Sequence, residues 1–193
     1  MTQNYDTSLW NCSMLEFRNR VAAGTPTPGG GAVAAVAATF AAALIRMVCA
    51  IHSKQNSDSE MTVIGAKAKI CEEELARCAE EDIRVFDRYM AARRVRSVSA
   101  RPDIQRCLLE CAEMPLAAAE AVAKLEEYAA EMVPNTPGFL LSDLATARHL
   151  LHASRKALLG NVIVNLMDLD DGEARRAVLA RLCPLQRDAN TAC

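Results

Sequence analysis

Aromatic and histidine residues are scarce in this sequence: phenylalanine, tryptophan and tyrosine make up 4% of the chain, and there are three histidines. His149 and His152 can share a ligand on one helix face, but no third ligand follows at a standard metal spacing. None of the eight cysteines forms a C-x-x-C pair. No stretch alternates between apolar and polar residues with a period of two. We therefore expect no metal site and no β-sheet.

An excess of either charge is also missing. The net charge is −2 and the isoelectric point is near 6.0, so neither nucleic acid nor an anionic membrane is indicated as a partner. The first ten residues lack the basic and apolar regions of a secretory signal, and we expect a cytoplasmic protein. Most cysteines fall on apolar helical stripes, where reduced cysteine behaves as a small hydrophobe. The length of 193 residues predicts one domain, residues 1–193, with a substantial core.

The chain is organised around the segment from Thr25 to Ile51, where prolines and glycines lead directly into a long apolar run. Pro26 and Pro28 fix the backbone in an extended form that cannot continue a helix. Gly29–Gly31 have no side chains, so they permit a positive φ and the close approach of another group. Two interpretations remain open: the glycines form a sharp turn only, or they open a helix N-terminus that binds an anion or a carbonyl oxygen.

The helix expected from about Ala32 to Ile51 is apolar on every face except at Thr39 and Arg46. Such a helix lies either in the centre of a bundle or in a membrane. Its many alanines contribute little transfer free energy and Arg46 is charged, so we expect a buried central helix. Its small side chains would let neighbouring helices, including those of a second subunit, pack at short distance.

Apolar residues at helical spacing predict the remaining elements, and we expect an all-α bundle of about six mostly antiparallel helices. The expected elements are a first helix capped by Ser8 or Thr7 and ended by Gly24, a long helix from about Asp58 to Ala92, a helix from Pro102 past Leu125, a helix opened by Ser142-Asp143, and a last helix after Asp168 to Gly172, with loops at His52 to Ser59 and Val133 to Leu141.

Two residues interrupt these helical patterns. Asp82 occupies a position in the otherwise apolar stripe of the long helix. Either it is a buried carboxylate that must be paired or used, or the stripe has already reached solvent. Pro115 lies inside the next helix, where it removes the hydrogen bond to Cys111 and is expected to kink the helix.

Polar residues also gather at the ends of the fifth expected helix. Ser142 and Asp143 can serve as an N-cap and a favourable charge in the first turn. Asn161 and Asn165 share one helix face and can satisfy buried backbone groups. Taken alone, these residues indicate no particular reaction.

Several short motifs, taken in order, resemble the cyclodeaminase/cyclohydrolase family: the C-terminal domain of formiminotransferase-cyclodeaminase and the stand-alone bacterial methenyltetrahydrofolate cyclohydrolases. The motifs span most of the chain. They are Pro26-Thr27-Pro28-Gly29-Gly30-Gly31 before an alanine-rich helix that ends in Met47-Val48-Cys49; Asp82 with Phe86 and Met90; Ile104-Gln105 leading to Met114-Pro115-Leu116; Ser142-Asp143; and Asn161-Val162 with Asn165, followed by Leu169-Asp170.

The resemblance implies an all-α homodimer with sites near the subunit interface. It also implies one-carbon chemistry on a tetrahydrofolate derivative as substrate, of the C–N hydrolase or ammonia-lyase type, without a metal or redox cofactor. A cyclohydrolase adds water to the 5,10-methenyl cation, whereas a cyclodeaminase expels ammonia from 5-formiminotetrahydrofolate as N10 closes on the amidine carbon. Both reactions need proton transfer, which a positioned carboxylate can provide.

Site residues follow from the same resemblance. Asp143 is the first candidate for the general acid/base and Asp82 the second. The other expected residues contact the substrate. Pro28, Gly29, Gly30 and Gly31 contact it through backbone groups, and Lys54 binds the anionic folate tail. Ser142, Asn161 and Asn165 form hydrogen bonds with it.

Two alternative functions remain. The segment Ile51 to Asn56 stands where the family commonly has a lysine-rich run. One alternative is therefore a family enzyme that cyclises, deaminates or hydrolyses a non-folate formimino or amidine compound in a biosynthetic pathway. The other is an inactive helical dimerisation module.

Overall fold

Helices account for every regular element in the computed structural model, which describes residues 8–55, 59–95 and 100–191. The elements are η1 (Leu9–Asn11), α1 (Met14–Val21), α2 (Gly30–Gln55), α3 (Ser59–Arg94), α4 (Arg101–Met132), η3 (Val133–Asn135), η4 (Gly138–Leu140), α5 (Leu141–Met167) and α6 (Glu173–Thr191). No strand occurs within these residues, which confirms the all-α fold class.

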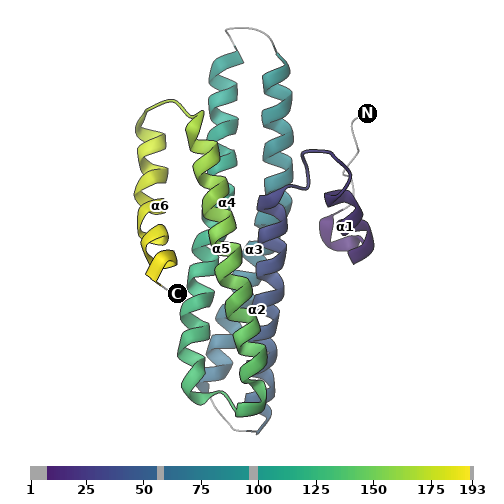
Figure 1. Ribbon diagram of the computed structural model, residues 1–193, viewed down its shortest axis with the longest axis vertical. Helices are drawn as coiled ribbons and strands as arrows, with labels where there is room; N and C mark the ends of the chain where they lie inside the picture. The colour runs from purple at the N-terminus through teal and green to yellow at the C-terminus, as the bar shows by residue number, and fades with distance from the viewer. Residues whose placement is uncertain (1–7, 56–58, 96–99, 192–193) are drawn as a thin grey trace.

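Helices α2, α3, α4 and α5 form the bundle. Each packs against two of the others, in the order α2, α3, α4, α5 and back to α2. In Figure 1 α6 lies along one side of the bundle, where it contacts α4 and α5, and the short α1 lies on the opposite side. The core is a continuous apolar cluster from all four long helices and α6. This arrangement confirms the predicted bundle.

The alanine-rich helix α2 is largely buried, as its sequence predicts. Ala38, Ala41 and Ile45 are completely inaccessible to solvent. Residues Gly30–Lys54 are long and apolar enough to cross a membrane, but 56% of the most apolar window is already buried inside the bundle. The helix begins at Gly30 and ends at Gln55, so it extends beyond the predicted limits at both ends. His52–Gln55, expected in a loop, form the last turn of the helix, whereas residues 56–58 lie outside the described part of the chain.

The first predicted helix is two elements. Ser8 caps the single 3-10 turn η1, and Ser13 caps α1 through a capping box with Glu16. The sequence pattern from Trp10 to Val21 missed this break, because its apolar spacing continues across it. Gly24 has a φ of 72° and follows α1, as expected for a glycine that ends a helix. Thr7, the alternative cap, lies outside the described residues.

The start of α5 also differs from the prediction. The helix begins at Leu141, and its N-cap residue is Leu140, whose side chain makes no capping bond. Ser142 is therefore inside the first turn, where its carbonyl accepts a hydrogen bond from the Thr146 hydroxyl at 2.9 Å. Asp143 does occupy the first turn, where its charge is favourable. The cap assigned to Ser142 is wrong, since the 3-10 turn η4 runs directly into α5.

The cysteines agree with the expectation of reduced core residues. Seven are described, and all seven are free thiols. The buried ones are Cys49, Cys71, Cys78, Cys107 and Cys111. Cys183 is exposed, and Cys193 lies outside the described residues.

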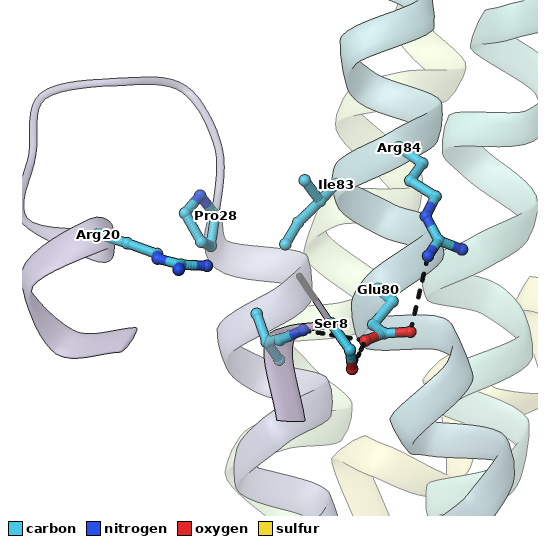
Figure 2. A pocket seen from close by; sticks show the side chains of 7 residues that line it. Ser8, Arg20, Pro28, Glu80, Ile83 and Arg84 are labelled. Atoms are coloured by element: carbon cyan, nitrogen blue, oxygen red, sulfur yellow. Dashed lines mark hydrogen bonds and ion pairs between the residues drawn. The ribbon is translucent and has the colours of Figure 1, made fainter. Parts of the chain in front are cut away.

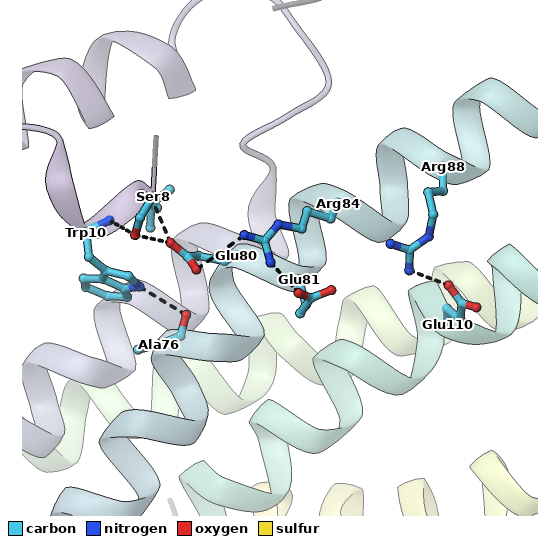
Figure 3. A network of polar contacts seen from close by, with 9 residues as sticks. Ser8, Trp10, Ala76, Glu80, Glu81, Arg84, Arg88 and Glu110 are labelled. Carbon is cyan, nitrogen blue, oxygen red and sulfur yellow. Dashed lines mark hydrogen bonds and ion pairs between the residues drawn. The ribbon is translucent and has the colours of Figure 1, made fainter. Parts of the chain in front are cut away.

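The segment before α1 contacts α3 through a group of residues that we call the N-terminal clasp. Ser8 and Leu9 bond to Glu80, and Trp10 bonds to Ala76. The Ser8 hydroxyl and the Leu9 N–H both donate to the Glu80 carboxylate, the latter at 3.0 Å. The Trp10 indole N–H donates to the Ala76 carbonyl at 3.2 Å. Figure 3 shows Glu80 at the centre of these bonds, with Arg84 on its other side.

Leu9 is the apolar part of the clasp. It packs with Ala32, Ala35 and Val36 of α2 and with Ile83 of α3. A pocket of about 30 Å³ remains between the clasp, the loop at Pro28 and α3, and Figure 2 shows Glu80 and Arg84 on one side of it. The clasp therefore covers the place where the beginning of α2 meets α3.

Truncation of Leu9 to alanine is expected to release the clasp. Loss of a buried leucine side chain costs about 2–5 kcal/mol, which is as large as the combined contribution of three hydrogen bonds at about 0.5–1.5 kcal/mol each. Trp10 is the one tryptophan of the chain, so its fluorescence emission should shift to the red in Leu9→Ala. Leu15→Ala, at a residue that is 56% exposed, is the matched control and should leave the emission unchanged. An unshifted spectrum in both variants would show that the clasp does not depend on Leu9.

Candidate active site

A cavity of about 180 Å³ lies where the loop before α2 meets the long helices. It is lined by residues of that loop and the start of α2, by two residues of α3, by one of α4 and by three of α5. They are Pro26, Thr27, Gly29, Gly30, Gly31, Asp82, Phe86, Cys111, Asn161, Val164 and Asn165. Six of the residues that the sequence singles out as site candidates, Gly29 to Gly31, Asp82, Asn161 and Asn165, thus meet at one place.

Asp82 is hydrogen-bonded to the first turn of α2. The Ala32 N–H donates to Asp82 Oδ2 at 3.0 Å. Helix α2 has no acidic residue in its own first turn, so this carboxylate from α3 satisfies a free N–H group of α2. Asp82 is therefore paired across two helices, and the interpretation in which it merely reaches solvent is wrong.

Gly31 is required for this contact. A Cβ built on Gly31 would lie 2.5 Å from Asp82 Oδ1 and 2.8 Å from Asp82 Cγ, which no side chain can accommodate without movement. Gly30 and Gly31 are helical, and among the described residues a positive φ occurs only at Gly24. Of the two properties that glycine offers, close approach is thus the one used here, and the glycines do not form a left-handed turn.

Burial raises the pKa of the Asp82 carboxyl group to about 6, and the hydrogen bond from Ala32 opposes this rise. A carboxyl group with a pKa near 6 exchanges its proton readily close to neutral pH. That property is what a general acid/base needs, and it is found at the one carboxylate that lines the cavity.

Asn165 is held by a backbone carbonyl that Pro115 leaves without its usual partner. Pro115 has no N–H group, so it cannot bond the Cys111 carbonyl one turn earlier in α4. The Asn165 side-chain amide donates to that carbonyl instead, at 2.7 Å. Helix α4 continues without interruption from Arg101 to Met132. The expected loss of the Cys111 bond is confirmed, and a side chain of α5 replaces it.

Asn161 is held within its own helix. Its amide nitrogen donates to the Ala157 carbonyl at 2.9 Å. The amide lies beside Gly30, where an added Cβ would stand 3.6 Å from Asn161 Nδ2, an ordinary contact. Asn161 and Asn165 thus form one wall of the cavity, and the start of α2 forms the wall facing Asn161.

The loop before α2 is fixed by two threonines. The Thr27 hydroxyl donates to Asp87 Oδ1 at 3.1 Å, and the Thr25 hydroxyl donates to the Thr27 carbonyl at 2.9 Å. Thr27 and Pro28 are buried, and the peptide bond between them is cis. Of the predicted backbone contacts, Pro28 faces the small pocket beside the clasp, whereas the three glycines line the cavity.

Five lining residues were not among the candidates from the sequence: Pro26, Thr27, Phe86, Cys111 and Val164. Phe86 follows Asp82 by one helical turn and provides a flat apolar surface, which the i, i+4 spacing could have indicated. Burial and the neighbouring Asp82 raise the pKa of the Cys111 thiol to about 12. That thiol remains protonated and is no nucleophile.

The other candidates lie at the far end of the bundle. Asp143 precedes Asn161 by eighteen residues along α5, a distance of about 27 Å at the rise of a helix. Helices α2 and α5 run antiparallel (Figure 1). Lys54 lies in the last turn of α2, and Ser142 and Asp143 lie in the first turn of α5, so the three share the same far end. Within one chain, Lys54, Ser142 and Asp143 do not line the cavity. Their roles stay predictions.

Across residues 8–55, 59–95 and 100–191, no group of three or more histidine, cysteine, aspartate or glutamate side chains is placed to hold a metal ion.

Known proteins were compared with this chain. The family model described as formiminotransferase-cyclodeaminase matches residues 13–183. The formimidoyltransferase-cyclodeaminase of Rattus norvegicus is 27% identical over 95% of this chain, which corresponds to 36% of the rat protein. The chain thus spans about a third of that relative's length. The methenyltetrahydrofolate cyclohydrolase of Methylorubrum extorquens is 25% identical, and the match covers 83% of this chain and 82% of that protein.

A solved structure is similar over nearly the whole chain. The crystal structure of a formiminotetrahydrofolate cyclodeaminase from Thermotoga maritima superposes with a TM-score of 0.86. The two chains are 27% identical, and the match covers 94% of this chain and 92% of the other.

Proposed function

Because this chain belongs to the formiminotransferase-cyclodeaminase family, we propose that it is a one-carbon enzyme that acts on a tetrahydrofolate derivative. It either hydrolyses 5,10-methenyltetrahydrofolate or cyclises 5-formiminotetrahydrofolate with loss of ammonia. The observation that carries the proposal is Asp82, a partly buried carboxylate with a pKa near 6 in a cavity that also holds Phe86. The names of the similar proteins support the substrate class.

In this proposal Asp82 moves the protons of either reaction. In hydrolysis it takes a proton from water as the oxygen bonds to the methenyl carbon. It passes this proton to N5 as the C–N5 bond breaks, and the remaining hydroxyl proton leaves to solvent as the formyl C=O forms. In deamination it takes the N10 proton as N10 bonds to the formimino carbon, and it returns that proton to the departing ammonia. General acid/base catalysis of this kind contributes about 10²–10⁴-fold to a rate. The carboxylate and the amides perform this chemistry without a metal.

We also propose that the chain forms a homodimer, and the apolar outer face of α2 and α5 supports this. Large apolar side chains are exposed on both helices, and we call this surface the α2/α5 face: Phe40 and Met47 on α2, and Ile163, Val164 and Met167 on α5. Exposed large apolar side chains on two neighbouring helices are the kind of surface that protein–protein interfaces cover. A second copy of the chain, related by a two-fold axis, would cover this face.

A two-fold axis that passes through the α2/α5 face perpendicular to the helices would make the two bundles antiparallel and bring their opposite ends together. The cavity of one subunit would then lie near the end of the partner that carries Lys54, Ser142 and Asp143. In such a dimer the roles predicted for these three residues, tail binding for Lys54 and proton transfer for Asp143, apply to the cavity of the other subunit.

Met47→Glu is the variant that tests the homodimer. A charge placed in an apolar interface is left without a partner, so the variant is expected to be monomeric in analytical ultracentrifugation at a protein concentration where the parent chain is dimeric. Ile70→Glu is the matched control. Ile70 is 68% exposed on α3, outside the α2/α5 face, and this variant should remain dimeric. A parent chain that sediments as a monomer would contradict the proposal directly.

The function itself is tested by incubating the purified chain with 5,10-methenyltetrahydrofolate and with 5-formiminotetrahydrofolate while absorbance is recorded. Turnover of either compound supports the folate assignment. Turnover of neither leaves the two alternatives, which separate on a set of non-folate formimino and amidine compounds. Hydrogen exchange of the cavity residues is measured with each of these compounds. If one compound slows the exchange, the substrate is of that kind; if no compound does, the chain is an inactive dimerisation module.

A further inference from the structure

We propose that the N-terminal clasp is a positioning element of the active site. In this proposal Leu9 holds the first turn of α2 against α3, and that contact keeps the Asp82 carboxyl group in its place in the cavity. The inference rests on the proposed function, in which Asp82 transfers protons. It adds to the site a segment whose described residues do not themselves line the cavity.

The first turn of α2 has little local support. Gly30 and Gly31 begin the helix, and glycine is a poor helix former. The first N–H groups of any helix lack partners within the helix, and α2 has no acidic residue in this turn. The position of the turn therefore depends on contacts with other elements.

Ala32 connects the clasp with the cavity. Its N–H donates to Asp82 Oδ2 at 3.0 Å. Its side chain belongs to an apolar cluster that also contains Leu9 and Ile83, and the residue is completely inaccessible to solvent. A displacement of Ala32 on the clasp side consequently changes the hydrogen bond with Asp82 on the cavity side.

Leu9 is the clasp's contribution to this cluster, which is separate from the main core of the bundle. Apart from Val36 and Ile83, the helix residues in the cluster are alanines, which provide little apolar surface. Leu9 packs over them from outside the bundle, and only 8% of it remains exposed. Truncation of Leu9 thus loosens the contact between the clasp and α2 and leaves the main core intact.

On α3, the residues that contact the clasp lie on both sides of Asp82 in the sequence. Glu80 accepts hydrogen bonds from the Ser8 hydroxyl and the Leu9 N–H, and Ile83 belongs to the apolar cluster. Figure 2 shows Glu80 and Ile83 at the small pocket beside the clasp. The clasp therefore contacts the same turn of α3 that carries the carboxyl group.

Few titratable groups surround Asp82. Its neighbours are the thiols of Cys78 on α3 and Cys111 on α4, and burial raises their pKa values to about 11 and about 12, so both stay uncharged where Asp82 titrates. The residues of α2, α5 and the loop before α2 that line the cavity carry no titratable side chain. On the clasp side, the Glu80 carboxylate is paired with Arg84.

Release of the clasp is expected to lower the pKa of Asp82. If the first turn of α2 moves away, water reaches the carboxyl group and the hydrogen bond from Ala32 is lost. Loss of burial lowers the pKa and loss of the bond raises it, but burial is the larger of the two influences. The pKa should therefore move from about 6 toward its ordinary value of 3.8.

Leu9→Ala tests the proposal. The pKa of Asp82 is measured by NMR titration of the carboxyl carbons in aspartate-labelled protein, in which Asp82→Asn identifies the signal. We expect the pKa to fall by about one unit or more in Leu9→Ala. With whichever folate compound the parent chain accepts, the acidic limb of the pH profile of kcat/KM should move to lower pH by the same amount. At pH 8, kcat should fall by about 10–10²-fold, because the carboxylate is displaced.

Two variants serve as controls. Leu15→Ala makes the same truncation at an exposed position of α1 and should change neither the pKa nor the rate. Leu9→Met keeps a similar apolar volume and should retain the parent pKa. An equal fall of the pKa in Leu15→Ala or in Leu9→Met overturns the proposal, because the effect would then not depend on the side-chain volume at Leu9.

An unchanged pKa in Leu9→Ala also overturns the proposal, provided that circular dichroism shows a folded bundle. If Leu9→Ala does not fold, Leu9→Val replaces it. This smaller truncation should lower the pKa of Asp82 by less, and no change in it contradicts the proposal. The titration needs no substrate, so a parent chain that turns over neither folate compound refutes the proposed function, whereas the NMR result alone decides whether the clasp positions Asp82.

Discussion

Asp82→Asn is expected to lower kcat by about 10²–10⁴-fold, the usual contribution of a general acid/base. The substitution keeps the shape of the side chain and the acceptor for the Ala32 N–H, so the cavity should retain its form. Only the exchangeable proton is lost. The measurement is steady-state turnover of whichever folate compound the parent chain accepts.

The control for this variant is a neutralised carboxylate that does not line the cavity. Glu81 is the neighbour of Asp82 on α3 and is bonded to Arg84 at 2.6 Å on the surface. Glu81→Gln should therefore retain full turnover. Full turnover in Asp82→Asn would show that Asp82 is not the acid/base, and Asp143 would regain its place as the first candidate.

The same substitution is expected to stabilise the fold. The pKa of Asp82 is raised from 3.8 to about 6 in the folded chain, so the folded state holds its proton more tightly than the unfolded state. Stability is then greatest below the unfolded pKa and falls as the pH rises through 6. At about 1.4 kcal/mol per pKa unit, the charged carboxylate costs roughly 3 kcal/mol above that range.

Asparagine does not carry this cost, so Asp82→Asn should have a higher Tm than the parent chain at pH 8 and an equal Tm below pH 4. For a chain of this length the gain is about 5–10 °C. Thermal denaturation at the two pH values measures it. A gain that is independent of pH would indicate a packing effect and would exclude the charge as its cause.

The fold could be predicted from the sequence because its signal is periodic. The apolar run of α2, the long stripe of α3 and three leucines of α5 spaced seven residues apart each specify a helix and a buried face. These leucines are Leu144, Leu151 and Leu158, and all three are buried. The errors occur where the pattern gives no local signal. Gly30 and Gly31 are helical although glycine disfavours helices, because the contact with Asp82 requires them there.

The candidate site was predicted in part, for a related reason. Asp82, Asn161 and Asn165 stood out because they are polar residues on helical faces that pack against neighbours. The pattern of polar and apolar residues does not rank them against Asp143. Asp143 sits in a helix first turn, a position that favours carboxylates in any protein, whereas the pKa of Asp82 depends on burial by helices distant in the chain. The Asn165 bond to Cys111 likewise joins residues 54 positions apart.

Among the glycines, Gly31 is the one at which an added methyl group is expected to be most damaging. The new Cβ would lie 2.5 Å from Asp82 Oδ1, so either the carboxylate or the first turn of α2 must move. Displacing a catalytic group by about 1 Å costs about 10²-fold in rate. Overpacking of this kind also costs about 1–3 kcal/mol of stability, although alanine by itself favours a helix over glycine by about 1 kcal/mol.

Gly30→Ala is the matched control, one residue earlier in the same turn. Its Cβ would be 3.6 Å from Asn161 Nδ2, an ordinary contact, so the backbone need not move. This variant should fold with an unchanged or slightly higher Tm, and its rate should exceed that of Gly31→Ala by about tenfold or more. The comparison separates helix propensity, which both alanines improve, from the approach of Asp82, which only Gly31 permits. Equal rates in the two variants would mean that Asp82 tolerates displacement, and a proton-transfer role that depends on its position would then be untenable.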